Sequence, residues 1–186
     1  DPSLLTLAAV KAIQDATFIA YPVSKEGEDS IAAKIASQWI TKDKALQPLV
    51  FPMVLETDPR RIAWTKATKK LLLLAAKGHQ VAFLCEGDVS LFASGCYVLL
   101  AIKANYPEYP LKIIPGINSF SAAAAIGNYP LALQNEQLLV MPTPNDSKTL
   151  EGLLDDSLEN HRILALLKLG DRWTWVRALL EKKNLL

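Results

Sequence analysis

Two segments of this sequence share one order of features, and this order constrains the fold more than any other pattern. The first runs VAFLCEGDVSLFASG from Val81, and the second runs LKIIPGINSFSAAAA from Leu111. Each starts with a continuous apolar run of strand length, which is typical of a strand buried on both faces of a parallel sheet. A polar turn with a glycine follows, and then a helix of small residues. We therefore expect an α/β fold with both turns at the carboxyl edge of its sheet, where small ligands bind.

The rest of the chain continues this alternation of strands and helices. We expect further strands at 18–21, 48–52, 137–141 and 161–168, and helices after Asp1-Pro2, at 31–39, from Asp58-Pro59 to Gly78, at 150–158 and after Gly170. The pattern changes after Tyr129-Pro130, so we place the boundary between a first domain of residues 1–132 and a second of residues 133–186. The second domain contains only two strands, which is small for an independent core, so we expect a longer protein.

Composition excludes several classes of function. The 186 residues carry a formal net charge of +1, which gives no general basic face for nucleic acid. The apolar runs are far shorter than the roughly 20 residues needed to cross a bilayer. The two cysteines, Cys85 and Cys96, lack the spacing of metal ligands. We therefore expect a cytoplasmic chain with reduced thiols, no membrane association, no nucleic-acid partner and no bound metal.

Side chains suited to acid, base or nucleophilic chemistry are few. His79 lies in a predicted turn, His161 precedes a predicted strand, and the chain has no G-x-S-x-G, Walker or G-x-G-x-x-G motif. Glu86-Gly87-Asp88 and the segment 115–119 remain as ligand-facing turns. Each also fits a plain structural role, as a solvated turn or as the start of a tightly packed helix. An enzyme with this inventory would depend on positioning its reactants more than on side-chain proton transfer.

The order of three motifs resembles the tetrapyrrole methylases, which use S-adenosylmethionine as methyl donor. These motifs are Asp1-Pro2-Ser3-Leu4-Leu5-Thr6, Glu86-Gly87-Asp88 and the run PGINSFSAA from Pro115. Within this family, Tyr21-Pro22-Val23-Ser24, Phe51-Pro52-Met53 and Leu167-Lys168-Leu169-Gly170 are most similar to the enzymes that methylate C(20) of precorrin-2 in cobalamin biosynthesis. Val89 departs from the family, which commonly has proline after Gly-Asp, and we expect a less rigid turn there.

The resemblance implies two α/β domains with the methyl donor in a cleft between them, usually in a homodimer. It also implies a strand before Asp1 and further strands after Leu186 that this chain does not contain. The implied donor-binding residues are Glu86, Gly87, Asp88, Leu91, Asn118, Ser119 and Leu167. The implied residues on the tetrapyrrole side are Asp1, Pro2, Tyr21, Ser24, Phe51 and Met53. No catalytic side chain is assigned, because an activated methyl group can pass directly to an electron-rich carbon.

Three functions are consistent with these features. The leading one is methylation of C(20) of precorrin-2 or of its cobalt-containing counterpart. The second keeps the donor but changes the acceptor to another ring position, an RNA nucleotide or a protein side chain, and the near-neutral charge argues against RNA. The third is a catalytically silent ligand-binding module. Lys25, Arg60, Arg61 and Lys168 are candidates to anchor substrate carboxylates, although an ordinary solvated surface charge is the favoured interpretation for each one taken singly.

Overall fold

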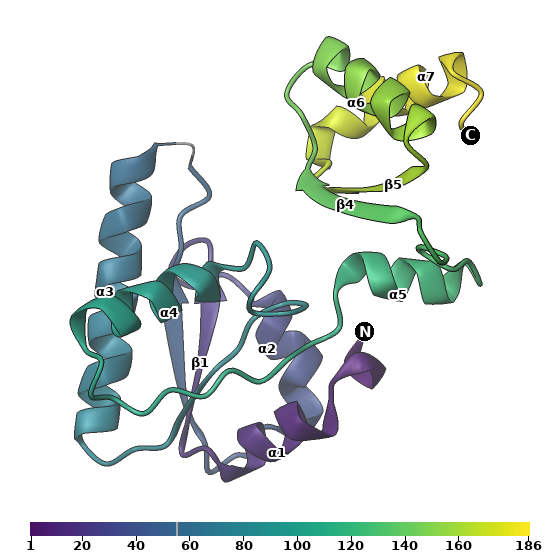
Figure 1. Cartoon of the computed structure of the whole chain (residues 1–186). Coiled ribbons are helices and arrows are strands. Elements are labelled where there is room, and N and C mark those ends of the chain that lie inside the picture. The colour runs from purple at the N-terminus through teal and green to yellow at the C-terminus, as the bar shows by residue number, and fades with distance from the viewer. Residues whose placement is uncertain (55) are drawn as a thin grey trace. The chain divides into compact units, whose positions relative to one another are not determined.

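The computed structural model describes residues 1–54 and 56–186, which form two compact units (Figure 1). The first unit comprises Asp1–Ser119 and the second Phe120–Leu186. Each unit contains a parallel sheet with helices, so the predicted α/β class is confirmed. The division falls at the start of helix α5 (Ser119–Ile126), earlier than the boundary after residue 132 that the sequence indicated.

The sheet of the first unit has three parallel strands in the order β2-β1-β3. These strands are β1 (Phe18–Val23), β2 (Ala45–Val50) and β3 (Val81–Phe83). Phe18 is in register with both Ala45 and Val81, so β1 is hydrogen-bonded on both sides. Because the strands run in one direction, their carboxyl ends lie at one edge of the sheet. The loops that follow the three strands therefore start from that edge.

Helices cover both faces of this sheet (Figure 1). One face packs against α3 (Thr57–Ala76) and α4 (Ser94–Asn105), and the other packs against α1 (Leu7–Asp15), α2 (Ile31–Ala36) and the short 3₁₀ helix η2 (Ser37–Trp39). Ile19 and Ala20, neighbours on β1, are both 0% exposed and belong to opposite cores. Successive side chains of a strand point to opposite faces, so burial on both faces produces the continuous apolar run.

Two capping residues start the N-terminal segment. The Asp1 carboxylate accepts the amide of Ser3 at 2.8 Å, but only one 3₁₀ turn follows, η1 (Pro2–Leu4). The hydroxyl of Thr6 then accepts the amide of Ala9 at 3.1 Å and starts α1. The predicted helix after Asp1-Pro2 is therefore divided into two, because Thr6 provides a second N-cap within it.

The predicted strand at the start of the second opening segment is wrong. Residues 111–114 belong to no strand, and Leu111 and Ile113 are 45% and 42% exposed. An apolar run becomes a strand only when a neighbour provides backbone hydrogen-bond partners. Among the described strands β3 pairs with β1, and none pairs with residues 111–114.

The second unit is built on two parallel strands, β4 (Gln137–Pro142) and β5 (Arg162–Leu167). Besides α5, its helices are α6 (Ser147–Glu159), the 3₁₀ turn η3 (Gly170–Arg172) and α7 (Trp173–Lys182). Leu150 of α6 and Val176 of α7 are 0% and 1% exposed and form the centre of its core. Asp146 caps α6, since its carboxylate accepts the amide of Thr149 at 2.8 Å.

Candidate functional site

Loops at the carboxyl edge of the first sheet carry most of the predicted site residues. Residues 24–30 follow β1, residues 51–54 follow β2, and residues 84–93 follow β3. The parallel order of the strands therefore places Ser24, Met53 and Glu86 in loops that leave the same edge. This edge is where the sequence analysis expected a ligand.

The turn after β3 is organised by Asp88. Its Oδ1 atom accepts the amide of Ser90 at 2.8 Å and also accepts the hydroxyl of Ser90. This is the local arrangement by which aspartate commonly stabilises a turn. Gly87, the preceding residue, has φ = +64°, a left-handed conformation that glycine adopts without steric cost. The glycine and the aspartate of the motif thus have distinct roles in shaping the backbone.

The same aspartate joins this turn to the second opening segment. The amide of Gly116 donates to Asp88 Oδ2 at 2.9 Å, across 28 residues of sequence. The contact is close, because a Cβ atom on Gly116 would lie 2.1 Å from the carbonyl oxygen of Gly87. We call Gly87, Asp88, Ser90 and Gly116 the turn clasp. The structure therefore brings together the two turns that the sequence analysis selected.

Hydrogen bonds keep the clasp carboxylate ionised. The Ser90 hydroxyl, followed by the amides of Gly116 and Ser90, holds the pKa of Asp88 below its ordinary value. Each of these donors stabilises the charged form of the carboxyl group. Asp88 is therefore an acceptor at neutral pH and is poorly suited to act as a general acid.

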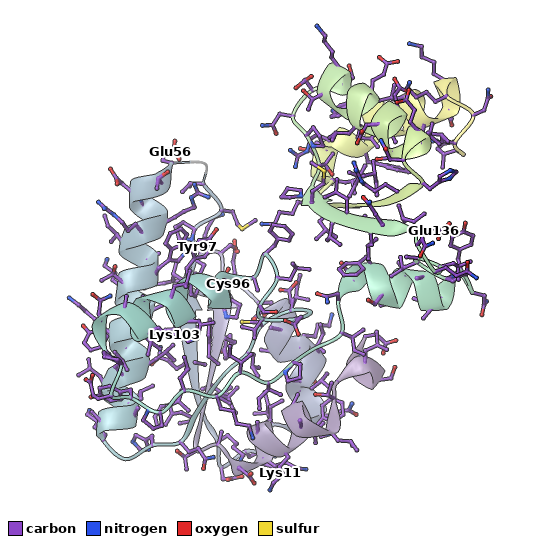
Figure 2. The ribbon with its side chains drawn as sticks, viewed as in Figure 1. Lys11, Glu56, Cys96, Tyr97, Lys103 and Glu136 are labelled. Carbon is purple, nitrogen blue, oxygen red and sulfur yellow. The ribbon has the colours of Figure 1, made fainter. Side chains whose placement is uncertain are left out.

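The turn at Val89 is closely packed against the start of α4. A Cβ atom on Gly95 would lie 2.5 Å from Val89 Cγ2 and 2.6 Å from Cys85 Sγ, so the first turn of α4 lies directly against the loop. The thiol of Cys96, labelled in Figure 2, donates to the carbonyl oxygen of Val89 at 2.9 Å. Burial raises the pKa of the Cys85 thiol to about 11, so it stays protonated at neutral pH. Residues Gly95 and Cys96 of α4 therefore both contact the loop.

The N-terminal segment reaches the second turn of the site. The hydroxyl of Thr6 donates to the carbonyl oxygen of Pro115 at 3.3 Å. Asp1 and Pro2, predicted on the tetrapyrrole side, are both exposed in this segment, and the Asp1 carboxylate is engaged with Ser3. The structure therefore ties the N-terminal segment to the loop that contains Gly116.

The other residues predicted on the tetrapyrrole side differ in their exposure. Met53 is 89% exposed, whereas Phe51 is 7% exposed and stacks on Phe83 within the core. Tyr21 is half-buried against the other core of the unit. The hydroxyl of Ser24 donates to Glu28 and is the main cause of that carboxyl's lowered pKa. Of these four side chains, Met53 is the one most open to a ligand.

The remaining predicted donor residues lie in both units. Glu86 is exposed, and Leu91 and Asn118 are half-buried in the first unit. Ser119 is the exposed first residue of α5. Leu167 ends β5 in the second unit, where its carbonyl oxygen accepts both the amide and the hydroxyl of Thr143 at 2.8 Å. Leu167 is thus held firmly at the carboxyl end of its own strand.

Sequence reasoning did not identify the individual contacts of three residues that shape the site, namely Thr6, Ser90 and Gly116. The spacing of Asp88 and Ser90 is a recognised turn signal and could have identified the local bond. Gly116 was selected only as part of a turn, and nothing local marks its close approach to Gly87. The bond from Thr6 spans 109 residues, so it depends on the tertiary fold.

Neither histidine belongs to the loops at this edge. Thr17 and Gln80 precede β1 and β3, so His79, which lies 3.5 Å from the Thr17 hydroxyl, is at the opposite edge of the sheet. His161 precedes β5 in the second unit. Throughout residues 1–54 and 56–186, no cluster of three or more His, Cys, Asp or Glu side chains could hold a metal. In the same residues, no helix has the length and apolar character needed to cross a membrane.

Comparison with known proteins identifies the family. Residues 1–185 match the family described as Tetrapyrrole (Corrin/Porphyrin) Methylases. The chain is 29% identical over 185 residues to the cobalt-precorrin-2 C(20)-methyltransferase of Salmonella typhimurium, an alignment that covers 100% of this chain and 75% of that protein. It is 33% identical over 156 residues to the probable cobalt-precorrin-2 C(20)-methyltransferase of Methanocaldococcus jannaschii, covering 84% of this chain and 64% of that protein.

A solved structure shares the fold. The crystal structure of the methyltransferase CobJ matches with a TM-score of 0.64 and 22% identity, over 97% of this chain and 71% of that chain. At this identity the likeness concerns the fold alone. The family match, in contrast, extends over nearly the whole chain. The protein therefore belongs to the tetrapyrrole (corrin/porphyrin) methylase family.

Proposed function

We propose that this protein is an S-adenosylmethionine-dependent methyltransferase that methylates C(20) of precorrin-2 or cobalt-precorrin-2 in cobalamin biosynthesis. The observation that carries the proposal is the bond from Gly116 to Asp88, which joins the two expected donor-binding turns in the first unit. Relatives that carry the name cobalt-precorrin-2 C(20)-methyltransferase support the choice of substrate.

The residues around the clasp suit the polar groups of S-adenosylmethionine. Glu86 offers an exposed carboxylate to hydroxyl or amine groups, and Asn118 offers an amide that can both donate and accept. Gly87 and Gly116 have no side chains, which allows the two turns that carry these residues to pack closely against each other. With Leu91 and Ser119, and with Asp88 through the turn that it shapes, these residues form the proposed donor site, to which the resemblance adds Leu167 of the second unit.

The donor supplies an already activated methyl group when it is bound. The task of the protein is then to hold donor and acceptor in line and to exclude water, and this can contribute up to roughly 7 to 11 kcal/mol to the lowering of the barrier. A site without a nucleophilic triad or a basic histidine is consistent with this chemistry. Asp88 keeps its charge and shapes the turn, and no residue is assigned to proton transfer.

The proposed tetrapyrrole side includes Asp1, Pro2, Tyr21, Ser24, Phe51 and Met53. Met53 is the member best placed to touch an apolar ring surface, because it is 89% exposed. Arg60 and Arg61 lie in the first turns of α3, which starts after the same sheet edge, and would face the carboxylates of such a substrate. Phe51 would act by supporting the loop, since its ring is part of the core.

Methyl transfer by the full-length protein tests the proposal. The protein is incubated with methyl-labelled donor and with precorrin-2, cobalt-precorrin-2 and other reduced tetrapyrroles in separate reactions. We expect transfer to precorrin-2 or cobalt-precorrin-2 above all the others. Faster transfer to another reduced tetrapyrrole would favour methylation at a different ring position. Other tetrapyrroles are included because the chain is 30% identical over 131 residues to a siroheme synthase of Methylococcus capsulatus. Tight donor binding without any turnover would favour a silent binding module.

The resemblance also supports a homodimer. Light scattering during size-exclusion chromatography of the full-length protein measures this directly. We expect the mass of two chains, and the mass of one chain at micromolar concentration would contradict the expectation.

A further inference from the structure

The Asp88 carboxylate is committed to the protein itself. It accepts three hydrogen bonds, from the amide and the hydroxyl of Ser90 and from the amide of Gly116. An ionised carboxylate offers about four acceptor positions, so most of its capacity is used within the clasp. Such charge-assisted bonds are stronger than bonds between neutral groups.

The clasp also couples two pieces of backbone. Gly116 is close enough to Gly87 that a Cβ atom would meet the carbonyl oxygen at 2.1 Å and the carbonyl carbon at 2.9 Å. The Asp88 bond and this close contact therefore fix one relative position of the two turns. Asn118 and Ser119, two of the proposed donor residues, directly follow the second turn.

We propose that Asp88 is a positioning residue, which orders the methyl-donor site by holding the Gly116 turn against the Gly87 turn and does not itself bind the donor. This inference rests on the proposed function, because it assigns the manner in which one residue of that site acts. It differs from the expectation of a side-chain contact between Asp88 and the donor. The donor would instead meet the backbone and the neighbouring side chains that the clasp places.

Amide hydrogen exchange and ligand binding distinguish the two roles. Exchange at Gly116 is measured by NMR on the full-length protein, and affinity for S-adenosylhomocysteine is measured by calorimetry. The variants are Asp88→Ala, Gly116→Ala and the double variant. Asp146→Ala is the matched control, because Asp146 also accepts an amide and a hydroxyl, both from Thr149 only three residues away.

A positioning role predicts that both readouts change together. In Asp88→Ala we expect exchange at Gly116 to accelerate, and the Kd for S-adenosylhomocysteine to rise, each by roughly tenfold or more. The double variant should bind no more than about threefold more weakly than the weaker single variant, because both changes release the same turn. Asp146→Ala should leave Kd unchanged.

Two results would overturn the inference. One is a rise in Kd for Asp88→Ala while the Gly116 amide stays protected, since this indicates direct contact with the donor. The other is a double variant in which the fold-increase in Kd equals the product of the fold-increases in the two single variants. Failure of the proposed function gives a different pattern, because the unaltered protein would then not bind S-adenosylhomocysteine, although Asp88→Ala would still expose the Gly116 amide.

Discussion

Replacing Gly116 with alanine should destabilise the first unit, and the size of the effect follows from the geometry. The new Cβ atom would lie 2.1 Å from the Gly87 carbonyl oxygen, whereas ordinary contact begins at 3.4 Å. The atoms nearest to the new methyl group belong to the backbone of Gly87 and Asp88. The turn therefore has to move by more than about 1 Å. Overpacking of this kind costs about 1 to 3 kcal/mol, and the bond to Asp88 at 2.9 Å is stretched at the same time.

We therefore expect Gly116→Ala to lower the free energy of unfolding by about 2 to 4 kcal/mol. Urea denaturation, followed by circular dichroism, measures the change. Gly152→Ala in α6 is the matched control, because nothing lies within 4 Å of the added Cβ atom. That control should be stabilised by up to about 1 kcal/mol, since alanine is the better helix former. Equal stability of Gly116→Ala and the unaltered protein would refute the close contact.

Three further predictions concern stability. Lys44 donates to two carbonyl groups at the end of α1, one of them at 2.7 Å. Lys44→Met should therefore lower the free energy of unfolding, measured by thermal denaturation, by about 1 kcal/mol. An equal loss in Lys42→Met, at an exposed lysine, would contradict this. The pKa of Asp88 is lowered in the folded state, so its stabilisation is present above the unfolded pKa and is lost as pH falls through the folded pKa. Asp88→Asn should thus lower stability by about 1 kcal/mol at pH 7 and by progressively less as pH falls through the folded pKa, and a pH-independent loss would count against this. Leu150→Ala, at a side chain that is 0% exposed, should lower the free energy of unfolding by about 3 to 5 kcal/mol. Leu158→Ala, at a side chain that is 56% exposed, should lower it by less than about 0.5 kcal/mol, and similar losses in the two variants would contradict the assigned core.

Local sequence patterns were sufficient to predict those elements whose own residues favour one conformation. The apolar run around Ile19 and Ala20 predicted a strand, because side chains buried on both faces leave no polar alternation. The turn after β3 was predicted for the same kind of reason, since Gly87 and Asp88 are residues that favour turns. The expected alternation of strands and helices then followed from the spacing of such runs.

Long-range contacts were not predictable from local patterns. Residues 111–114 have the composition of a strand, yet no described strand pairs with them. Likewise, the residues next to Asp88 in the sequence do not determine whether its carboxylate faces solvent, a ligand or another part of the chain. Its bond to Gly116 depends on a turn 28 residues away, and residues 111–114 before that turn belong to no described strand.

The position of the transferred methyl group tests the central claim most directly. The full-length protein is incubated with donor carrying a ¹³C-labelled methyl group and with precorrin-2 or cobalt-precorrin-2, and the product is studied by NMR. The proposed function predicts one enriched methyl group, bonded to C(20) of the macrocycle. Enrichment at any other ring carbon, or an unmodified substrate after incubation with a protein that binds S-adenosylhomocysteine, would contradict it.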